Sequence, residues 1–147
     1  MRAAPRPIDP RGPRFNQAVT AVLLALGFVL DWWWVVPAVA VALGTGAIFG
    51  PRYGPFLRIW ASLLAPRVGP PSELEDPRPP RFAAWVGTVF LTLATVAFVS
   101  GLEPLGWVLA LLVAALAGLA AVTGLCLGCE IYVRLRMAGR PSRSPVT

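Results

Sequence analysis

The two cysteines of the chain stand three residues apart, at Cys126 and Cys129. On a helix, residues at i and i+3 share a face with their Cβ atoms about 5–6 Å apart, and a disulfide needs about 3.5–4.5 Å. A modest local adjustment would therefore let this pair form and break a disulfide. The same spacing suits a persulfide carrier, or a soft metal held with a partner's help, but two thiols cannot complete a tetrahedral zinc site.

Four further residues border the pair in the candidate site. Glu130 follows Cys129 directly, and its charge disfavours a thiolate. Arg134 lies four residues after Glu130, which is the spacing of a modest ion pair on a helix. Its positive charge favours a thiolate, in contrast to that of Glu130. Tyr132 lies in the same stretch. Asn16 stands level with the cysteines at the start of the first apolar segment, where its amide would cap a helix or donate to a sulfur.

The position of the pair argues against a strongly reactive thiolate. We expect the last apolar segment to continue as a helix into the pair, near a helix C-terminus where the macrodipole disfavours an anion. Redox C-x-x-C motifs usually place the reactive thiol at a helix N-terminus, which here would need Gly124 and Gly128 to break the helix. Alternatively, the cysteines are small residues packed beside a small-xxx-small glycine pattern, or one of them is lipidated.

The composition places the chain in the membrane class. Of its 147 residues, 56% are hydrophobic and 14% charged, and the mean hydropathy is +0.67. Soluble domains average about 45–50% apolar and about 25% charged residues. There is no histidine, which removes the commonest general base and the commonest zinc ligand. We therefore expect no metal, no cofactor and no independent enzymatic activity.

The apolar stretches predict an all-α membrane protein with four transmembrane helices in two hairpins. As one helix, residues 18–49 would be about 48 Å long, too long for a hydrocarbon core of about 30 Å. Asp31 divides this stretch, and the tryptophans at 32–34 suit the headgroup level. The predicted spans cover residues 14–30, 32–50, 82–100 and 105–127.

The remaining segments are expected to lie outside the bilayer core. Residues 53–64 carry aromatic and aliphatic side chains at helical spacing, which predicts a short amphipathic helix in the interface between the hairpins. Residues 1–13 are rich in arginine and proline and predict a disordered cytoplasmic arm. Residues 138–147 predict a cytoplasmic tail, so the membrane domain runs over residues 14–137.

The arginines predict the orientation. All 13 basic residues are arginines, and they fall at or before the start of the first span, in the central loop or in the tail. The two hairpin turns hold only Asp31 and Glu103. Because short loops rich in Lys and Arg stay in the cytoplasm, we expect a multi-pass protein of the cell membrane with both termini cytoplasmic. Nucleic-acid binding would instead need a basic face on a soluble fold.

The two hairpins share a weak sequence pattern. The motif Arg-Phe-x-x-x-Val begins at Arg14 and again at Arg81, and Gly50 after the second span has a counterpart at Gly128 after the fourth. Both hairpins run the same way, so a duplication would be a parallel repeat. Shared composition at membrane boundaries accounts for the pattern equally well.

Several blocks together resemble one bacterial family. They are R-F-N-Q before the first span, G-P-R after the second, R-F-A before the third and C-L-G-C-x-x-Y closing the fourth. Over residues 10–136 the chain is similar to the membrane family catalogued as domain of unknown function 4395. The resemblance implies a small integral membrane protein with Cys126 and Cys129 on the motif positions. It also implies association with a soluble thioredoxin-like or sulfurtransferase protein, but no activity.

Three functional hypotheses follow. The first is a thiol-redox or sulfur relay at the cytoplasmic face, where the reducing cytosol keeps Cys126 and Cys129 as a dithiol at rest. The second is a non-enzymatic scaffold or partner-binding subunit in which both cysteines only fill space. The third is a permease for small sulfur compounds, whose polar path could use only the threonines of the spans, at positions 45, 88, 92, 95 and 123; Thr88, Thr92 and Thr95 recur at helical spacing. The lipid bilayer is a partner in all three, and a homo-oligomer stays open.

Overall fold

The computed structural model describes residues 6–124 and 126–139, which are helical apart from turns and one isolated β-bridge. Residues 51–68 are irregular and include a 3-10 turn (Pro51–Tyr53) and a π-helical turn (Trp60–Leu64). The α-helices are α1 (Arg11–Val29), α2 (Val35–Phe49), α3 (Pro55–Ile59), α4 (Ala65–Val68), α5 (Arg78–Val99), α6 (Glu103–Thr123) and α7 (Leu127–Ala138).

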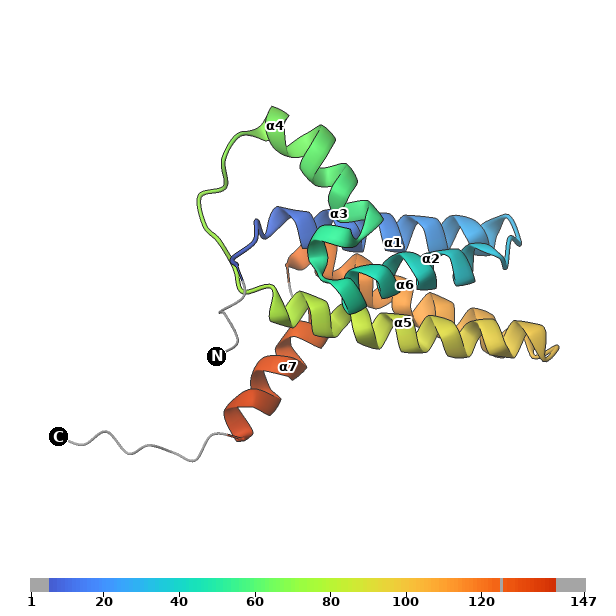
Figure 1. Ribbon diagram of the computed structural model, residues 1–147. Helices are drawn as coiled ribbons and strands as arrows, with labels where there is room; N and C mark the ends of the chain where they lie inside the picture. Colours follow the sequence, from blue (N-terminus) through green and yellow to red (C-terminus); the bar gives the residue numbers. More distant parts are fainter. Residues whose placement is uncertain (1–5, 125, 140–147) are drawn as a thin grey trace.

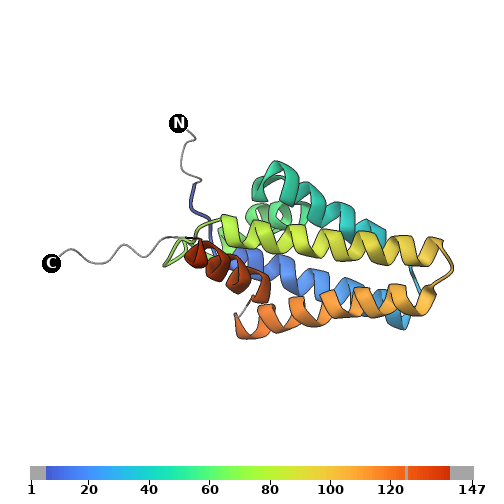
Figure 2. The ribbon, with the colours of Figure 1, turned by 90° about the horizontal axis from the view of Figure 1, so that it is seen from below.

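Four of these helices form an elongated bundle of two hairpins (Figure 1). The α1–α2 turn and the α5–α6 turn lie at the same end, and α7 diverges from the opposite end (Figures 1 and 2). The hairpins pack on each other, because α1 contacts mainly α6 and α2 contacts mainly α5. The all-α prediction is therefore confirmed.

Small residues let the helices of the bundle approach closely. Leu24, Leu91 and Ala110 are fully buried in a core of Leu, Val and Ala side chains. A Cβ on Gly87 would lie only 3.3 Å from the Leu43 side chain, so α5 and α2 meet where a side chain is missing. Close packing of this kind is common both in bundles and between helices in membranes.

Large apolar side chains also cover the outside of the bundle. By length and composition, α5 and α6 are apolar enough to cross a membrane, and α2 is apolar but shorter. Helix α1 does not reach the same standard, since Arg14, Asn16 and Gln17 occupy its first turns. Two of the four predicted spans therefore correspond to helices that are long and apolar enough to cross a membrane, and a third corresponds to a shorter apolar helix. Exposed apolar residues on these helices include Val22, Val41, Leu93, Val96, Val108 and Val122.

Several predicted boundaries differ from the structure. Residues 11–13 belong to α1 rather than to a disordered arm, and Ile8 pairs with Glu75 through two backbone hydrogen bonds of 2.9 Å. The helix predicted over 105–127 ends at Thr123. The amphipathic segment predicted over 53–64 is helical but irregular, and it continues to Val68. Residues 1–5 and 140–147, in the predicted arm and tail, lie outside the described residues.

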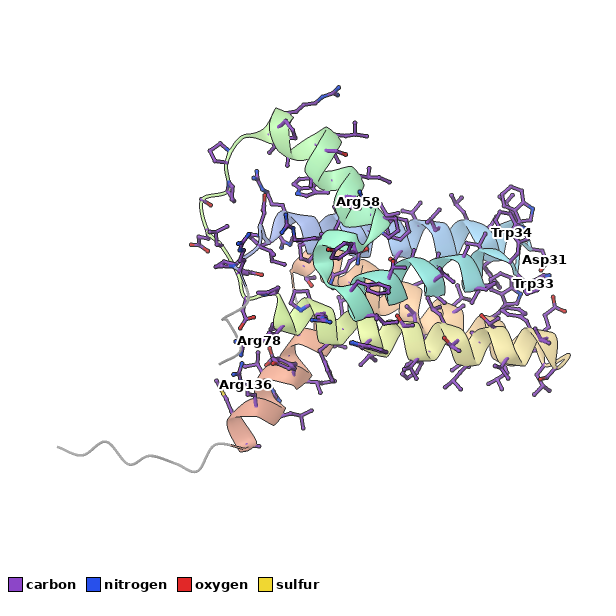
Figure 3. The ribbon with its side chains drawn as sticks, viewed as in Figure 1. Asp31, Trp33, Trp34, Arg58, Arg78 and Arg136 are labelled. Carbon is purple, nitrogen blue, oxygen red and sulfur yellow. The ribbon has the colours of Figure 1, made fainter. Side chains whose placement is uncertain are left out.

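Aromatic side chains join the two hairpins at the turn end. Trp107 packs edge-on against Phe28 at 5.3 Å and against Phe98 at 5.0 Å between ring centroids, and Trp33 lies 6.0 Å from Phe98. Such pairs stabilise beyond their buried area. Figure 3 shows Asp31, Trp33 and Trp34 at this end, with Arg78 and Arg136 towards the other.

Two arginines join the hairpins at the opposite end in a reciprocal way. From α5, Arg81 donates to the carbonyl oxygens of Ala47 (2.6 Å) and Ile48 (2.7 Å) in the last turn of α2. From α1, the Arg14 guanidinium lies against Gly124, just after the last turn of α6. Each helix begins three residues before its arginine, at Arg11 and Arg78. This symmetry favours the duplication suggested by the sequence, with Gly124 rather than Gly128 as the partner of Gly50.

The Arg81 contact generates a stability prediction. Replacing Arg81→Met should lower the free energy of unfolding by about 1–2 kcal/mol, because two helix-end carbonyls lose a charged donor. The matched control is Arg78→Met, whose ion pair with Asp76 is 3.7 Å long and exposed and should matter by less than about 0.5 kcal/mol. Denaturation of the purified protein followed by circular dichroism measures both. Equal losses would mean that the Arg81 hydrogen bonds contribute nothing specific.

Candidate functional site

A glycine in the left-handed conformation separates α6 from the cysteine pair. Gly124 has φ 76°, and its N–H donates to the Ala120 carbonyl oxygen at 2.9 Å, which closes α6. Glycine favours this conformation because it has no Cβ. The chain then extends at Cys126, and α7 begins at Leu127. The expectation that the pair lies near the end of a continuous helix is therefore wrong, because Gly124 ends α6, whereas Gly128 lies inside α7.

Cys126 is the N-cap residue of α7. Its Sγ accepts the backbone N–H of Cys129 at 3.4 Å, and its carbonyl oxygen accepts the N–H of Glu130 at 2.9 Å. The free N–H groups at a helix N-terminus favour negative charge. The first sulfur of the pair therefore occupies the position that thiol-exchange motifs use for their reactive thiol.

The second cysteine has the opposite character. The hydrogen bond with Cys126, followed by burial, raises the pKa of the Cys129 thiol well above its usual range. The charges of Cys126 and of Glu75, which lies on the connector (residues 69–77) between α4 and α5, raise it further. Cys129 therefore holds its proton more firmly than an ordinary thiol, whereas Cys126 lies at a helix N-terminus, so the two sulfurs are chemically distinct.

The four bordering residues have different surroundings. Arg134 Nε lies 3.1 Å from Glu130 Oε1, as their spacing predicts, on the exposed side of the helix. The Tyr132 ring packs against Phe82 of α5 at 5.5 Å between centroids. Asn16 cannot cap α1 as proposed, because the helix begins five residues earlier at Arg11. It lines the same cavity as Cys126 instead.

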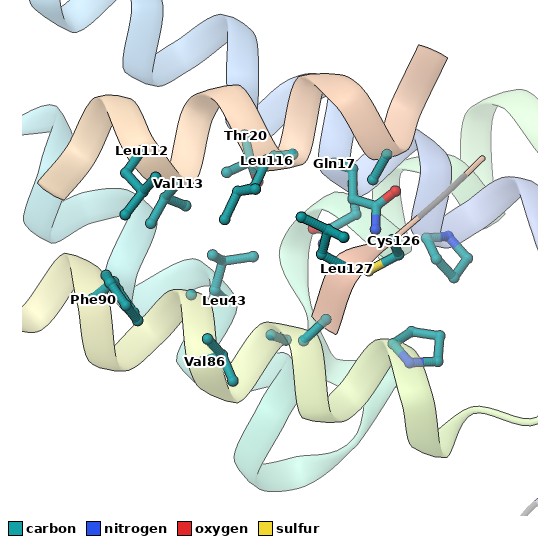
Figure 4. A pocket seen from close by; sticks show the side chains of 18 residues that line it. Gln17, Thr20, Leu43, Val86, Phe90, Leu112, Val113, Leu116, Cys126 and Leu127 are labelled. Atoms are coloured by element: carbon teal, nitrogen blue, oxygen red, sulfur yellow. The ribbon is translucent and has the colours of Figure 1, made fainter. Parts of the chain in front are cut away.

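Two hollows meet at Cys126. The inner pocket, of about 120 Å³, has Asn16, Gln17, Thr20 and Cys126 among its polar lining, with apolar walls from α2, α5 and α6 (Figure 4). The cysteine groove is larger, about 810 Å³, and open. Cys129 also lines the groove. Its charged lining residues include Glu73, Glu75 and Asp76 from the connector and Arg11, Arg14 and Arg134 from the helices.

Arg11 fixes the wall of the groove that α1 and the connector share. Its guanidinium binds Asp9 at 2.9 Å and the Gly69 carbonyl oxygen at 2.9 Å. The hydrogen bond from Arg11 lowers the pKa of the Asp9 carboxyl. Within residues 6–124 and 126–139, no three His, Cys, Asp or Glu side chains gather as a metal site would require.

The fold and site define a small all-α protein of two apolar hairpins with a dithiol at the start of a diverging helix. The chain belongs to the family described as Domain of unknown function (DUF4395), which matches residues 8–137. The family resemblance inferred from the sequence blocks is thereby confirmed. No curated protein and no solved structure matches the chain.

The helix break generates a prediction on two glycines. Gly124→Ala should destabilise the protein more than Gly101→Ala, although both have a positive φ (76° and 82°). Each alanine should cost about 1–2 kcal/mol for the left-handed backbone, but only a Cβ at 124 would collide with Arg14, since nothing lies within 4 Å at 101. Denaturation curves of the two variants give the comparison. Equal curves would show that Arg14 moves aside freely.

The different environments of the two sulfurs generate a pH prediction. A free cysteine ionises near about pH 8.5, whereas the raised pKa keeps Cys129 as an unreactive thiol at that pH. Iodoacetamide should therefore modify Cys126 first across pH 7–9, as mass spectrometry would measure. In Cys126→Ala, which removes the main cause of the shift, Cys129 should react at lower pH than in the native chain. Equal rates for both thiols would contradict this assignment.

Proposed function

We propose that the chain is a four-span protein of the cell membrane whose Cys126–Cys129 pair exchanges disulfides with a soluble cytoplasmic protein. The observation that carries the proposal is the N-cap position of Cys126, with the Cys129 N–H donated to its sulfur at 3.4 Å. This arrangement stabilises the thiolate that exchange requires.

The membrane part of the proposal is supported by the distribution of side chains. The bundle is apolar outside as well as inside, which a soluble surface rarely is. Trp33 and Trp34 lie at one end, and Arg78 and Arg136 lie towards the other (Figure 3), as expected for interfacial anchors and the positive-inside rule. In this arrangement α1 and α2 supply the remaining two spans, and both termini are cytoplasmic.

The irregular helical segment from Pro51 to Val68 suits the membrane interface. It projects sideways from the arginine end of the bundle (Figure 1). Ile59, Leu63 and Val68 expose their side chains there, and Trp60 packs on Phe15 of α1 at 5.7 Å. An amphipathic segment of this kind lies in the headgroup region with its apolar residues towards the acyl chains.

The exchange reaction divides between the two sulfurs. The Cys126 thiolate attacks a disulfide of the partner, forms a mixed disulfide and releases one partner thiolate, which takes up a proton. The Cys129 thiol then loses its proton and attacks Cys126 Sγ, so the second partner sulfur leaves. The partner gains two electrons and the pair becomes a disulfide; the reverse sequence reduces the pair. A thioredoxin-like or sulfurtransferase protein is the partner class proposed.

The two alternative functions receive less support. Space-filling cysteines in a scaffold would be buried, whereas Cys126 and Cys129 are partly exposed and line the groove. A permease would need polar groups facing a path. The hydroxyls of Thr88, Thr92 and Thr95 instead donate to carbonyl oxygens four residues earlier on α5, at 2.7–2.8 Å.

A test of the exchange uses a chromogenic aromatic disulfide, dithiobis(nitrobenzoate), on the reduced protein in phospholipid nanodiscs. The native chain should release two thionitrobenzoate ions per protein, because Cys129 resolves the first mixed disulfide. Cys129→Ser should release one and keep a stable adduct on Cys126. Cys126→Ser should release one ion more slowly than Cys129→Ser, because burial still raises the pKa of the Cys129 thiol. Absorbance at 412 nm and intact-protein mass measure these outcomes.

Three results would contradict the proposal. Stable labelling of both sulfurs in the native chain would mean that Cys129 does not resolve a mixed disulfide. In intact cells, modification of the pair by a membrane-impermeant maleimide added outside would place it on the wrong face. Alanine at both positions that leaves partner trapping and cellular redox state unchanged would favour the scaffold.

A further inference from the structure

The inner pocket has the size of a single six-membered ring. Its volume is about 120 Å³, and an engineered protein cavity of about 150 Å³ is known to bind benzene. Leu43 of α2, Phe90 of α5 and Val113 of α6 contribute to its apolar walls (Figure 4). Such walls favour a flat apolar ring over hydrated ions.

Polar groups occur on the α1 side of this pocket. Asn16, Gln17 and Thr20 lie on one face of the helix, and Cys126 lies beside them. Thr20 is only 2% exposed, and its hydroxyl has no hydrogen-bond partner among the described residues. A buried hydroxyl without a partner is unfavourable, and a ligand oxygen would supply the missing bond. The two amides offer further donors.

The pocket also opens sideways onto the apolar exterior. Val86 of α5 and Leu112 and Leu116 of α6 line it, and their side chains are 37%, 44% and 39% exposed. These partly exposed side chains belong to α5 and α6, the two helices most suited to a bilayer. A ligand with an apolar tail could enter here from the lipid with its ring leading.

We propose that the inner pocket binds the ring of a lipid-soluble quinone, and that the Cys126–Cys129 dithiol reduces it. A quinone combines a flat ring of this size, carbonyl oxygens that accept hydrogen bonds from Thr20 and the amides, and an apolar tail. The inference rests on the proposed thiol exchange. Cys126 lines both the inner pocket and the cysteine groove, so it joins the membrane-side ligand to the cytoplasmic partner.

The electron transfer balances without another reagent. The dithiol loses two electrons and two protons as Cys126 Sγ and Cys129 Sγ form a bond. The quinone gains both and becomes a hydroquinone, which leaves on the side of α5 and α6. The soluble partner then reduces the disulfide in the groove. Electrons would pass from a cytoplasmic thiol protein to the lipid phase, one pair per cycle.

The experiment uses the full chain in nanodiscs with decylubiquinone, whose fully substituted ring cannot form a stable thiol adduct. Equilibrium binding is measured on Cys126→Ser, which cannot transfer electrons. Within this background, Thr20→Val should weaken binding about fivefold through one lost hydrogen bond. Ala117→Phe should abolish binding by filling the pocket that Ala117 lines. The matched control is Thr92→Val on the exposed side of α5, which should bind normally.

Turnover is measured anaerobically on the reduced native chain. One quinone should be reduced per protein, with loss of both free thiols, and the Thr20→Val and Ala117→Phe changes should slow this reaction in proportion to binding. No binding, or binding equal in all pocket variants, would overturn the inference. So would bound quinone that leaves the dithiol unoxidised. Release of two thionitrobenzoate ions by the same preparation would show that the exchange function survives that failure.

Discussion

The fold depends on how helix ends in an apolar setting satisfy their backbone groups. Backbone groups in the middle of a helix hydrogen-bond to one another, but the first N–H groups and the last carbonyl oxygens need partners outside the helix. Here Arg81 bonds to the carbonyl end of α2, Arg14 lies at the end of α6, and Cys126 caps the start of α7. These ends lie at the same side of the bundle, so the polar and reactive groups of the chain gather there.

Much of the architecture could be predicted from the sequence because it follows from local composition. Apolar runs bounded by charge, glycine and proline indicated α2, α5 and α6, and Asp31 with its tryptophans indicated the first hairpin turn. Residues Glu130 and Arg134 form an ion pair because helical spacing alone brings them together. The start of the first helix could not be predicted from apolar composition, because its opening turns contain the polar residues Arg14, Asn16 and Gln17.

The residues of the candidate site could be named from the sequence, but their arrangement in space could not. The sequence alone left open whether Gly124 continues a helix or adopts φ 76°, and its spatial neighbour Arg14 lies 110 positions earlier in the chain. The influence of Glu75 on Cys129 likewise comes from tertiary packing of the connector. Acidic residues in the connector and arginines at the span boundaries were visible signals, but their meeting around the cysteines was not.

The pairing of helices has a consequence for the order of assembly. The main partner of α1 is α6 and that of α2 is α5, whereas α1 and α2 contact each other less. As a chain grows from its N-terminus, the first hairpin must therefore wait, with its small-residue faces unpaired, until the second has been made. Its lasting partners arrive only with residues 78–123.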